Sequence, residues 1–177
     1  TANQGGGLGV HDIASATLID STVSGNSTPA DPRGGGDGAG IYAAGQNLDL
    51  ANVTVSGNDA EGSGGGVAVF SGLFSFDSVT LTNNSADADG DDEGDGGGFF
   101  AAEEEQGVVQ NSLIAGNTDV GGGEAPDCAG LVDSVGYNLI GVTDNSCGFG
   151  NTGDQTGTAA SPLLAGIGPL GDNGGGT

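Results

Sequence analysis

Short runs of alternating apolar and polar residues recur along the chain, and each run follows a glycine-rich stretch. A period of two is the pattern of a β-strand, and no stretch keeps the apolar spacing of an α-helix over three turns. Four such runs begin with a glycine and follow one another at similar intervals, so the chain contains an internal repeat. The four runs are Gly7-Leu8-Gly9-Val10, Gly40-Ile41-Tyr42-Ala43, Gly66-Val67-Ala68-Val69 and Gly98-Phe99-Phe100-Ala101.

Each repeat continues with two further pairs of mostly apolar positions. The second pairs are Ala16/Leu18, Leu48/Leu50, Phe74/Phe76 and Gly107/Val109, and the third pairs are Ser21/Val23, Val53/Val55, Val79/Leu81 and Ser112/Ile114. Three short strands cannot bury these positions alone, so repeats of this kind stack on one another. The sequence therefore predicts an all-β fold: a single domain formed by a right-handed, three-sided parallel β-helix. We expect about five coils, the last of them divergent, at residues 5–35, 36–63, 64–95, 96–130 and 131–177.

Polar residues and glycines recur at the predicted bends. One asparagine closes each repeat, and in a stacked fold its amide can bond the equivalent amide one rung away. We predict such a ladder, with a ligand-facing role as the alternative, at Asn26, Asn58, Asn84 and Asn117. A second polar corner is expected at Asp20, Asn52, Ser78 and Asn111. We attribute the glycine runs to corners that require positive φ, because a phosphate-binding loop would need a Lys and a helix.

Several motifs resemble the parallel β-helix repeats of large bacterial surface proteins. The family includes the polymorphic outer-membrane-protein-like and choice-of-anchor β-helix proteins. The motifs are GAGIY from Gly38, LDLANVTVSGN from Leu48, GGGVAV from Gly64, SVGYNLIG from Ser134 and GPLGDNGG from Gly168. The resemblance implies the same fold but no particular activity. We expect the chain to be a piece of a longer exported protein.

The chain has two cysteines, Cys128 and Cys147, which flank the expected fifth coil. They are too far apart in the sequence for the Cys-x-x-Cys spacing of a zinc site. We predict a disulfide between them. A disulfide indicates an oxidising compartment, so we expect an extracellular or cell-surface location.

The charge is strongly one-sided, with 24 acidic residues, one Arg and no Lys, for a net charge of −23. A surface of this charge repels nucleic acids and anionic lipids, and no apolar run is long enough to insert into a membrane. Many of the acids lie between the third and fourth coils. Carboxylates alternate there around a glycine, which favours a calcium site, with a solvated loop as the alternative. The candidate ligands are Asp87, Asp89, Asp91, Asp92 and Asp95.

Candidate catalytic residues are few. A lyase acting on acidic sugars needs a cationic base, and Arg33 is the single strong cation. Glycoside hydrolysis needs two carboxylates across a groove, and the sequence shows no catalytic set of Asp residues on the face of a predicted strand. His11 is the sole histidine and lies near one end, where we expect a surface position. We therefore expect no enzymatic activity.

The expected role is structural, as a filament subunit or a segment of an adhesin-like stalk. Exposed strand edges at the two ends of a short stack invite pairing with another copy, so we expect self-association end to end. The alternative is a module that contacts carbohydrate, such as surface glycans, or ice. It rests on an outward file of Thr22, Thr54 and Thr80, which Leu113 interrupts. A polysaccharide lyase or hydrolase is the third candidate.

Overall fold

The computed structural model describes residues 4–29, 35–102, 106–121, 126–143 and 147–171, and every regular element among them is a β-strand. In the first half of the chain the strands are β1 (Leu8–His11), β2 (Ser15–Ser24), β3 (Ser27–Thr28), β4 (Ile41–Ser56), β5 (Asp59–Ala60), β6 (Val67–Asp77), β7 (Thr80–Thr82) and β8 (Ser85–Ala86). In the second half they are β9 (Phe99–Ala101), β10 (Gln106–Gln110), β11 (Leu113–Ile114), β12 (Thr118–Asp119), β13 (Cys128–Ala129), β14 (Asp133–Gly136), β15 (Leu139–Ile140) and β16 (Gln155–Thr156).

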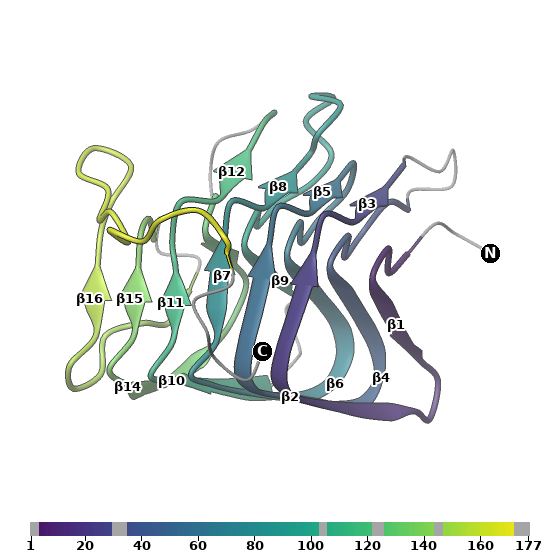
Figure 1. Cartoon of the computed structure of the whole chain (residues 1–177), viewed down its shortest axis with the longest axis horizontal. Helices are drawn as coiled ribbons and strands as arrows, with labels where there is room; N and C mark the ends of the chain where they lie inside the picture. Colours follow the sequence, from purple (N-terminus) through teal and green to yellow (C-terminus); the bar gives the residue numbers. More distant parts are fainter. Residues whose placement is uncertain (1–3, 30–34, 103–105, 122–125, 144–146, 172–177) are drawn as a thin grey trace.

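These strands form two sheets in which every pairing is parallel. The larger sheet has 12 strands and follows the path β13-β9-β6-β4-β7-β11-β15-β16, with β1 and β2 paired to β4 and β10 paired to β6 and β14. The smaller sheet has four strands in the order β12-β8-β5-β3. In Figure 1, β2, β7, β11, β15 and β16 stand along the front wall, and the small sheet lies above them. No helix in the described ranges has the length and apolarity needed to cross a membrane.

The pairing register joins equivalent positions of successive repeats. The first column runs Leu8, Ile41, Val67, Phe99 and Cys128, each paired with the next. The column of second-pair residues runs Leu18, Leu50, Phe76 and Val109. The all-β prediction and the stacking of these columns in parallel strands are therefore confirmed.

The interior is apolar and closely packed. The rings of Phe74, Phe76 and Phe99 form one cluster with centroids 5.1 to 5.3 Å apart. A Cβ on Gly107 would overlap the ring of Phe74, which explains why a glycine interrupts an otherwise apolar column. Burial weakens towards the first repeat, because Leu18 is only partly buried whereas its partner Leu50 is 1% exposed.

The glycine runs contain two kinds of position. Positive φ occurs at the first glycine of each motif, at Gly5, Gly38, Gly64 and Gly96, with φ between 62° and 73°. The leading glycines of the strands have no positive φ, so the explanation from backbone conformation is wrong for them. Glycine is needed at these positions because a Cβ would overlap neighbouring atoms. A Cβ on Gly66 would lie 2.5 Å from the carbonyl oxygen of Gly98 and 3.0 Å from Nδ2 of Asn84.

The residues of the second polar corner do not form a continuous ladder of side-chain hydrogen bonds. Its four members have φ between 49° and 59°, a left-handed conformation that short polar side chains tolerate; they are Asp20, Asn52, Ser78 and Asn111. Asn52 donates to Asp20 at 2.7 Å, but Asn111 donates to Asp77 instead of continuing the series. We infer that these residues are placed here chiefly for their backbone conformation.

Candidate functional site

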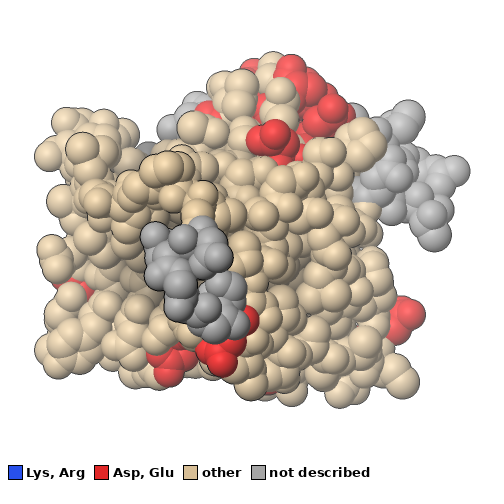
Figure 2. Space-filling view, viewed as in Figure 1, with Lys and Arg blue, Asp and Glu red and all other residues tan. Residues whose placement is uncertain are grey.

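The acidic loop follows β8 and brings together three of the five candidate calcium ligands. One carboxylate oxygen from each of Asp87, Asp89 and Asp91 lies within 4.8 Å of the others. Asp92 and Asp95 are not part of this group. Figure 2 shows acidic side chains gathered at the top of the molecule and along its lower edge.

Asp87 also organises the loop itself. Its side chain is fully buried, and its two carboxylate oxygens accept the backbone N–H groups of Asp91 at 3.0 Å and Asp92 at 3.1 Å. The pKa of Asp89 is raised, chiefly by desolvation and to a smaller extent by the negative charges of Asp91 and Glu61. Hard oxygen ligands at this spacing suit a calcium ion. The same hydrogen bonds would also stabilise a turn that holds no ion.

The four predicted asparagines form a continuous chain of side-chain hydrogen bonds. Nδ2 donates to Oδ1 of the next amide at 2.9 Å, from Asn26 to Asn58, from Asn58 to Asn84 and from Asn84 to Asn117. Each Oδ1 also accepts the backbone N–H of the preceding asparagine. Asn84 and Asn58 are at most 1% exposed, so these bonds satisfy polar groups that water cannot reach.

Asp127 terminates this ladder. Its Oδ1 accepts both the backbone N–H and Nδ2 of Asn117 at 2.9 Å, and its Oδ2 accepts the backbone N–H of Val142 at 2.8 Å. Asp127 occupies the place of a leading glycine, since its carbonyl accepts from Phe99 as that of Gly98 does from Val67. Burial raises the pKa of the Asp127 carboxyl, while the hydrogen bonds from Asn117 and Val142 oppose that rise.

A second buried polar chain, which sequence reasoning missed, runs through the last repeats. Ser112 accepts the backbone N–H of Val79 and donates its own N–H to Oδ1 of Asn138, both at 3.0 Å. Asn138 donates its backbone N–H and Nδ2 to Oδ1 of Asp154. Asp154 also accepts from Ser134 at 2.6 Å. Both chains therefore end on a carboxylate.

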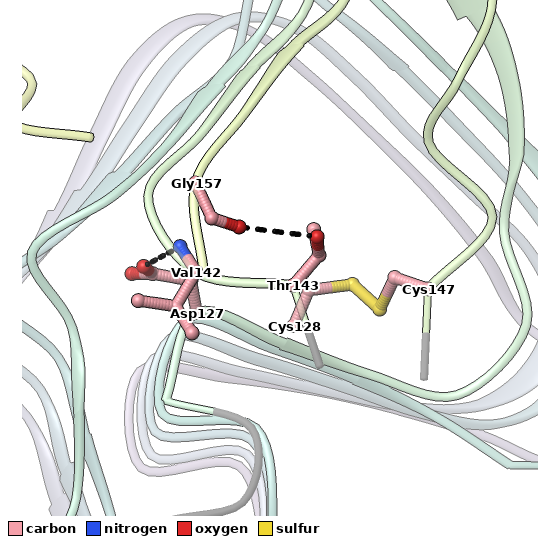
Figure 3. Close-up of a disulfide and its surroundings, with 6 residues drawn as sticks. All are labelled: Asp127, Cys128, Val142, Thr143, Cys147 and Gly157. Atoms are coloured by element: carbon pink, nitrogen blue, oxygen red, sulfur yellow. Dashed lines mark hydrogen bonds between the residues drawn. A yellow bond between two sulfur atoms is a disulfide. The ribbon is translucent and has the colours of Figure 1, made fainter. Parts of the chain in front are cut away.

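Cys128 and Cys147 form the predicted disulfide, with Cα atoms 6.1 Å apart. Both residues belong to the buried apolar cluster. Figure 3 shows the bridge inside the last turns of the chain, beside the bond between Val142 and Asp127 and the bond from Thr143 to the carbonyl of Gly157. The disulfide and the hydrogen bond from Val142 to Asp127 therefore both attach the segment at residues 142–147 to the strand that begins at Cys128.

Of the two candidate catalytic residues, the structure describes only His11. His11 is exposed, as expected, and its ring lies 5.2 Å from that of Tyr42. The file of rings continues through Phe70 and Phe100 at 5.4 and 5.2 Å. Arg33, the candidate lyase base, lies outside the described residues.

An outer cleft of about 360 Å³ crosses β4, β6, β10 and β14. Its floor includes the exposed side chains of Leu73 and Val108, and Asp49 and Asp133 also line it. The register places Asp49 three rungs from Asp133. Three rungs correspond to roughly 14 Å between the backbones. Glycosidase carboxyl groups are typically about 5–9.5 Å apart, so the backbones of this pair are separated by more than that distance.

The expected threonine file lies on the outside of the front wall. Thr22 pairs with Thr54 and Thr54 with Thr80, and Leu113 follows, as the sequence indicates. Residues 167–171, here called the tail, lie across this file and enclose a second cleft. Figure 1 shows the tail in yellow, crossing the front wall from the side of β16 towards β7.

Comparison with known proteins gives no relative for this chain: no family model matches it, and neither a curated protein nor a solved structure matches it.

Proposed function

We propose that the chain is a right-handed, three-sided parallel β-helix with a structural role in a secreted or cell-surface protein, as a filament subunit or a stalk segment. The observation that carries this proposal is the unbroken register of the first column from Leu8 to Cys128. A fold in which each repeat pairs only with its neighbours builds a rigid rod whose length depends on the number of repeats. The resemblance to bacterial surface β-helix proteins agrees with this role.

Two further observations support the location and the absence of catalysis in this proposal. The disulfide of Cys128 and Cys147 is typical of proteins that fold in an oxidising compartment. Asp49 and Asp133 border a cleft, and their backbones lie three strand pairings apart, farther than the carboxyl groups of a glycosidase.

The N-terminal edge of the stack supports self-association. Within the described ranges, β2 pairs on one side only, with β4. Its inward side chains Leu18 and Val23 are partly buried, whereas Leu50 and Val55 one rung away are at most 1% exposed. A further rung would bury the same apolar surface at this end. We propose that a second copy supplies it, stacking end to end.

Electron microscopy and sedimentation velocity test this proposal. We expect fibres or concentration-dependent oligomers, and we expect association to strengthen with salt, because screening weakens the repulsion between chains of net charge −23. The substitution Leu18→Asp should abolish association by placing a charge on the stacking surface. Thr17→Asp adds the same charge on the outer face and should leave it intact. A monodisperse monomer at all concentrations and salt levels would overturn the assembly proposal.

A further inference from the structure

The cleft beneath the tail has a volume of about 430 Å³, within the ~300–1,000 Å³ typical of small-molecule sites. One wall is the outer face of β2, β4 and β7, and the other is the tail, residues 167–171. Five hydroxyl side chains line the first wall: Thr22, Thr54, Ser56, Thr80 and Thr82. This cleft lies on the outer side of the stack, and of its hydroxyl residues only Thr22 belongs to β2, the strand at the edge proposed for self-association.

The hydroxyls form a regular array rather than a chance group. Thr54 pairs with Thr80, and Ser56 pairs with Thr82, so the two strands present matching hydroxyls in adjacent rungs. Neighbouring rungs are about 4.8 Å apart, and residues i and i+2 of one strand are roughly 6.6 Å apart on the same face. The array therefore offers donors and acceptors at a fixed spacing over a surface large enough for more than one ring of a ligand.

Two of these hydroxyl residues are almost fully buried and still border the cleft. Ser56 is 6% exposed and Thr82 is 7% exposed, and both line the cleft. Within the described residues no hydrogen bond occupies either hydroxyl, and neither oxygen is among the atoms that are cut off from solvent without a partner. Both hydroxyls are therefore available to donate to and accept from a ligand in the cleft.

The opposite wall is apolar and uncharged. Ile167, Pro169 and Leu170 contribute it, and none of the residues that line the cleft carries a charge. This is unusual in a chain of net charge −23. In Figure 2 the acidic side chains visible on this face lie mainly at the top of the molecule and towards its lower edge. The ligand that suits such a cleft is itself uncharged, with hydroxyls on one side and an apolar face on the other.

We propose that this cleft binds a neutral oligosaccharide. Sugar hydroxyls would bond the hydroxyl array of β4 and β7, and the C–H face of a ring would pack against Pro169 and Leu170. Exchange of water for a sugar hydroxyl gains little per bond, so the affinity is modest and depends on several bonds made together.

A glycan array that carries neutral, uronate-containing and sulfated oligosaccharides tests the proposal with the intact chain. We expect binding to neutral oligosaccharides and none to the acidic ones. Absence of binding to every neutral glycan, or a preference for acidic glycans, would overturn it.

Titration calorimetry with the best neutral glycan then localises the site. Thr54→Val and Thr80→Val each remove one hydroxyl while keeping a β-branched side chain, and each should weaken binding about fivefold, with a larger loss in the double variant. Thr17→Val removes an exposed hydroxyl of β2 that does not line the cleft and should bind as the parent does. Unchanged affinity in the double variant, with its folding verified by circular dichroism, would place the sugar elsewhere and refute the assignment. Because Leu18→Asp disrupts only the proposed stacking edge, its retention of sugar binding separates this site from the assembly proposal.

Discussion

Asn117 donates both its backbone N–H and its side-chain Nδ2 to a single oxygen of Asp127, each at 2.9 Å. The other oxygen of Asp127 accepts from Val142. A ladder of amides needs an acceptor at its last rung, because the Nδ2 group of each amide donates to the next residue in the series. Asp127 provides that acceptor and at the same time attaches the segment around Val142 to the stack.

The ladder should contribute strongly to stability. Asn84→Ala removes the acceptor for two donors of Asn58 and leaves buried groups unpaired, so we expect the free energy of unfolding to fall by about 3 kcal/mol. The control Asn47→Ala changes an exposed amide and should alter stability by no more than about 0.5 kcal/mol. Denaturant unfolding measures both. Equal effects of the two substitutions would show that the ladder adds nothing.

The leading glycines should resist substitution for steric reasons. In Gly66→Ala the new Cβ would lie 2.5 Å from a backbone oxygen that cannot move independently, and we expect a loss of about 2 kcal/mol or more. Gly150→Ala is the matched control, because no atom lies within 4 Å of the added Cβ and φ is not positive there. Thermal melting of the two variants checks the difference; a stable Gly66→Ala variant would contradict the close approach.

The two terminal carboxylates should respond to pH in opposite directions. Burial raises the pKa of Asp127, so its contribution to stability is full below the ordinary value of 3.8 and is lost as pH rises through its folded pKa. Burial also acts to raise the pKa of Asp154, but hydrogen bonds from Ser134, Asn138 and Asn151 outweigh it and lower the pKa. The contribution of Asp154 is therefore present above 3.8 and is lost as pH falls below it.

Unfolding free energies between pH 3 and 7 test this assignment. Asp154→Asn should flatten the rise of stability with pH at the acid end. Asp127→Asn should make the rise above pH ~4 steeper, because it removes a group whose effect has the opposite sign. The same change of slope in both variants would show that one of the two assignments is wrong.

The disulfide should stabilise the end of the stack. In the chain-entropy model a bridge that closes a loop of this length contributes about 3 kcal/mol, which corresponds to roughly 6–12 °C in melting temperature for a chain of this size. We expect the double variant Cys128→Ala/Cys147→Ala to melt lower by this amount. Hydrogen exchange should quicken in β14 and β15 while β4 and β6 stay protected. Uniform loss of protection would indicate that the bridge stabilises the whole chain.

Calcium should stabilise the fold if the acidic loop holds it. A ligand at a hundred times its dissociation constant adds about 2.7 kcal/mol. We expect millimolar calcium to raise the melting temperature more than sodium at equal ionic strength, and Asp89→Asn/Asp91→Asn to remove the difference. Asp59→Asn, an exposed residue of β5, should keep it. No response of the parent chain to calcium would leave the loop as a hydrogen-bonded turn around Asp87.

The columns of the interior were predictable because they depend on local periodicity repeated four times. A register error of one residue would turn Leu50 outwards, and the alignment of four repeats excludes that error. The positions of Asn58 and Asn84 were predictable for the same reason.

Apart from the disulfide and the acidic loop, the features that occur once were not predictable. Asp127 and Asp154 each replace a repeated residue at the last rung, and nothing in their local sequence distinguishes them from the many exposed acids. The steric role of Gly66 depends on the side chain of Asn84, which belongs to a later part of the chain and reaches this glycine only by stacking. The path of the tail over Thr54 and Thr80 is likewise a tertiary contact without a periodic signal.

The repeats differ in length almost entirely at one place. The connection from β5 to β6 covers residues 61–66, whereas the connection from β8 to β9 covers residues 87–98 and is twice as long. This difference accounts for the unequal spacing of the leading glycines Gly40, Gly66 and Gly98. The first column stays paired despite it, Ile41 with Val67 and Val67 with Phe99. Evolution, or a protein engineer, can therefore lengthen or exchange these surface insertions without disturbing the scaffold, which makes the connection after β5 a natural position for grafting a foreign peptide.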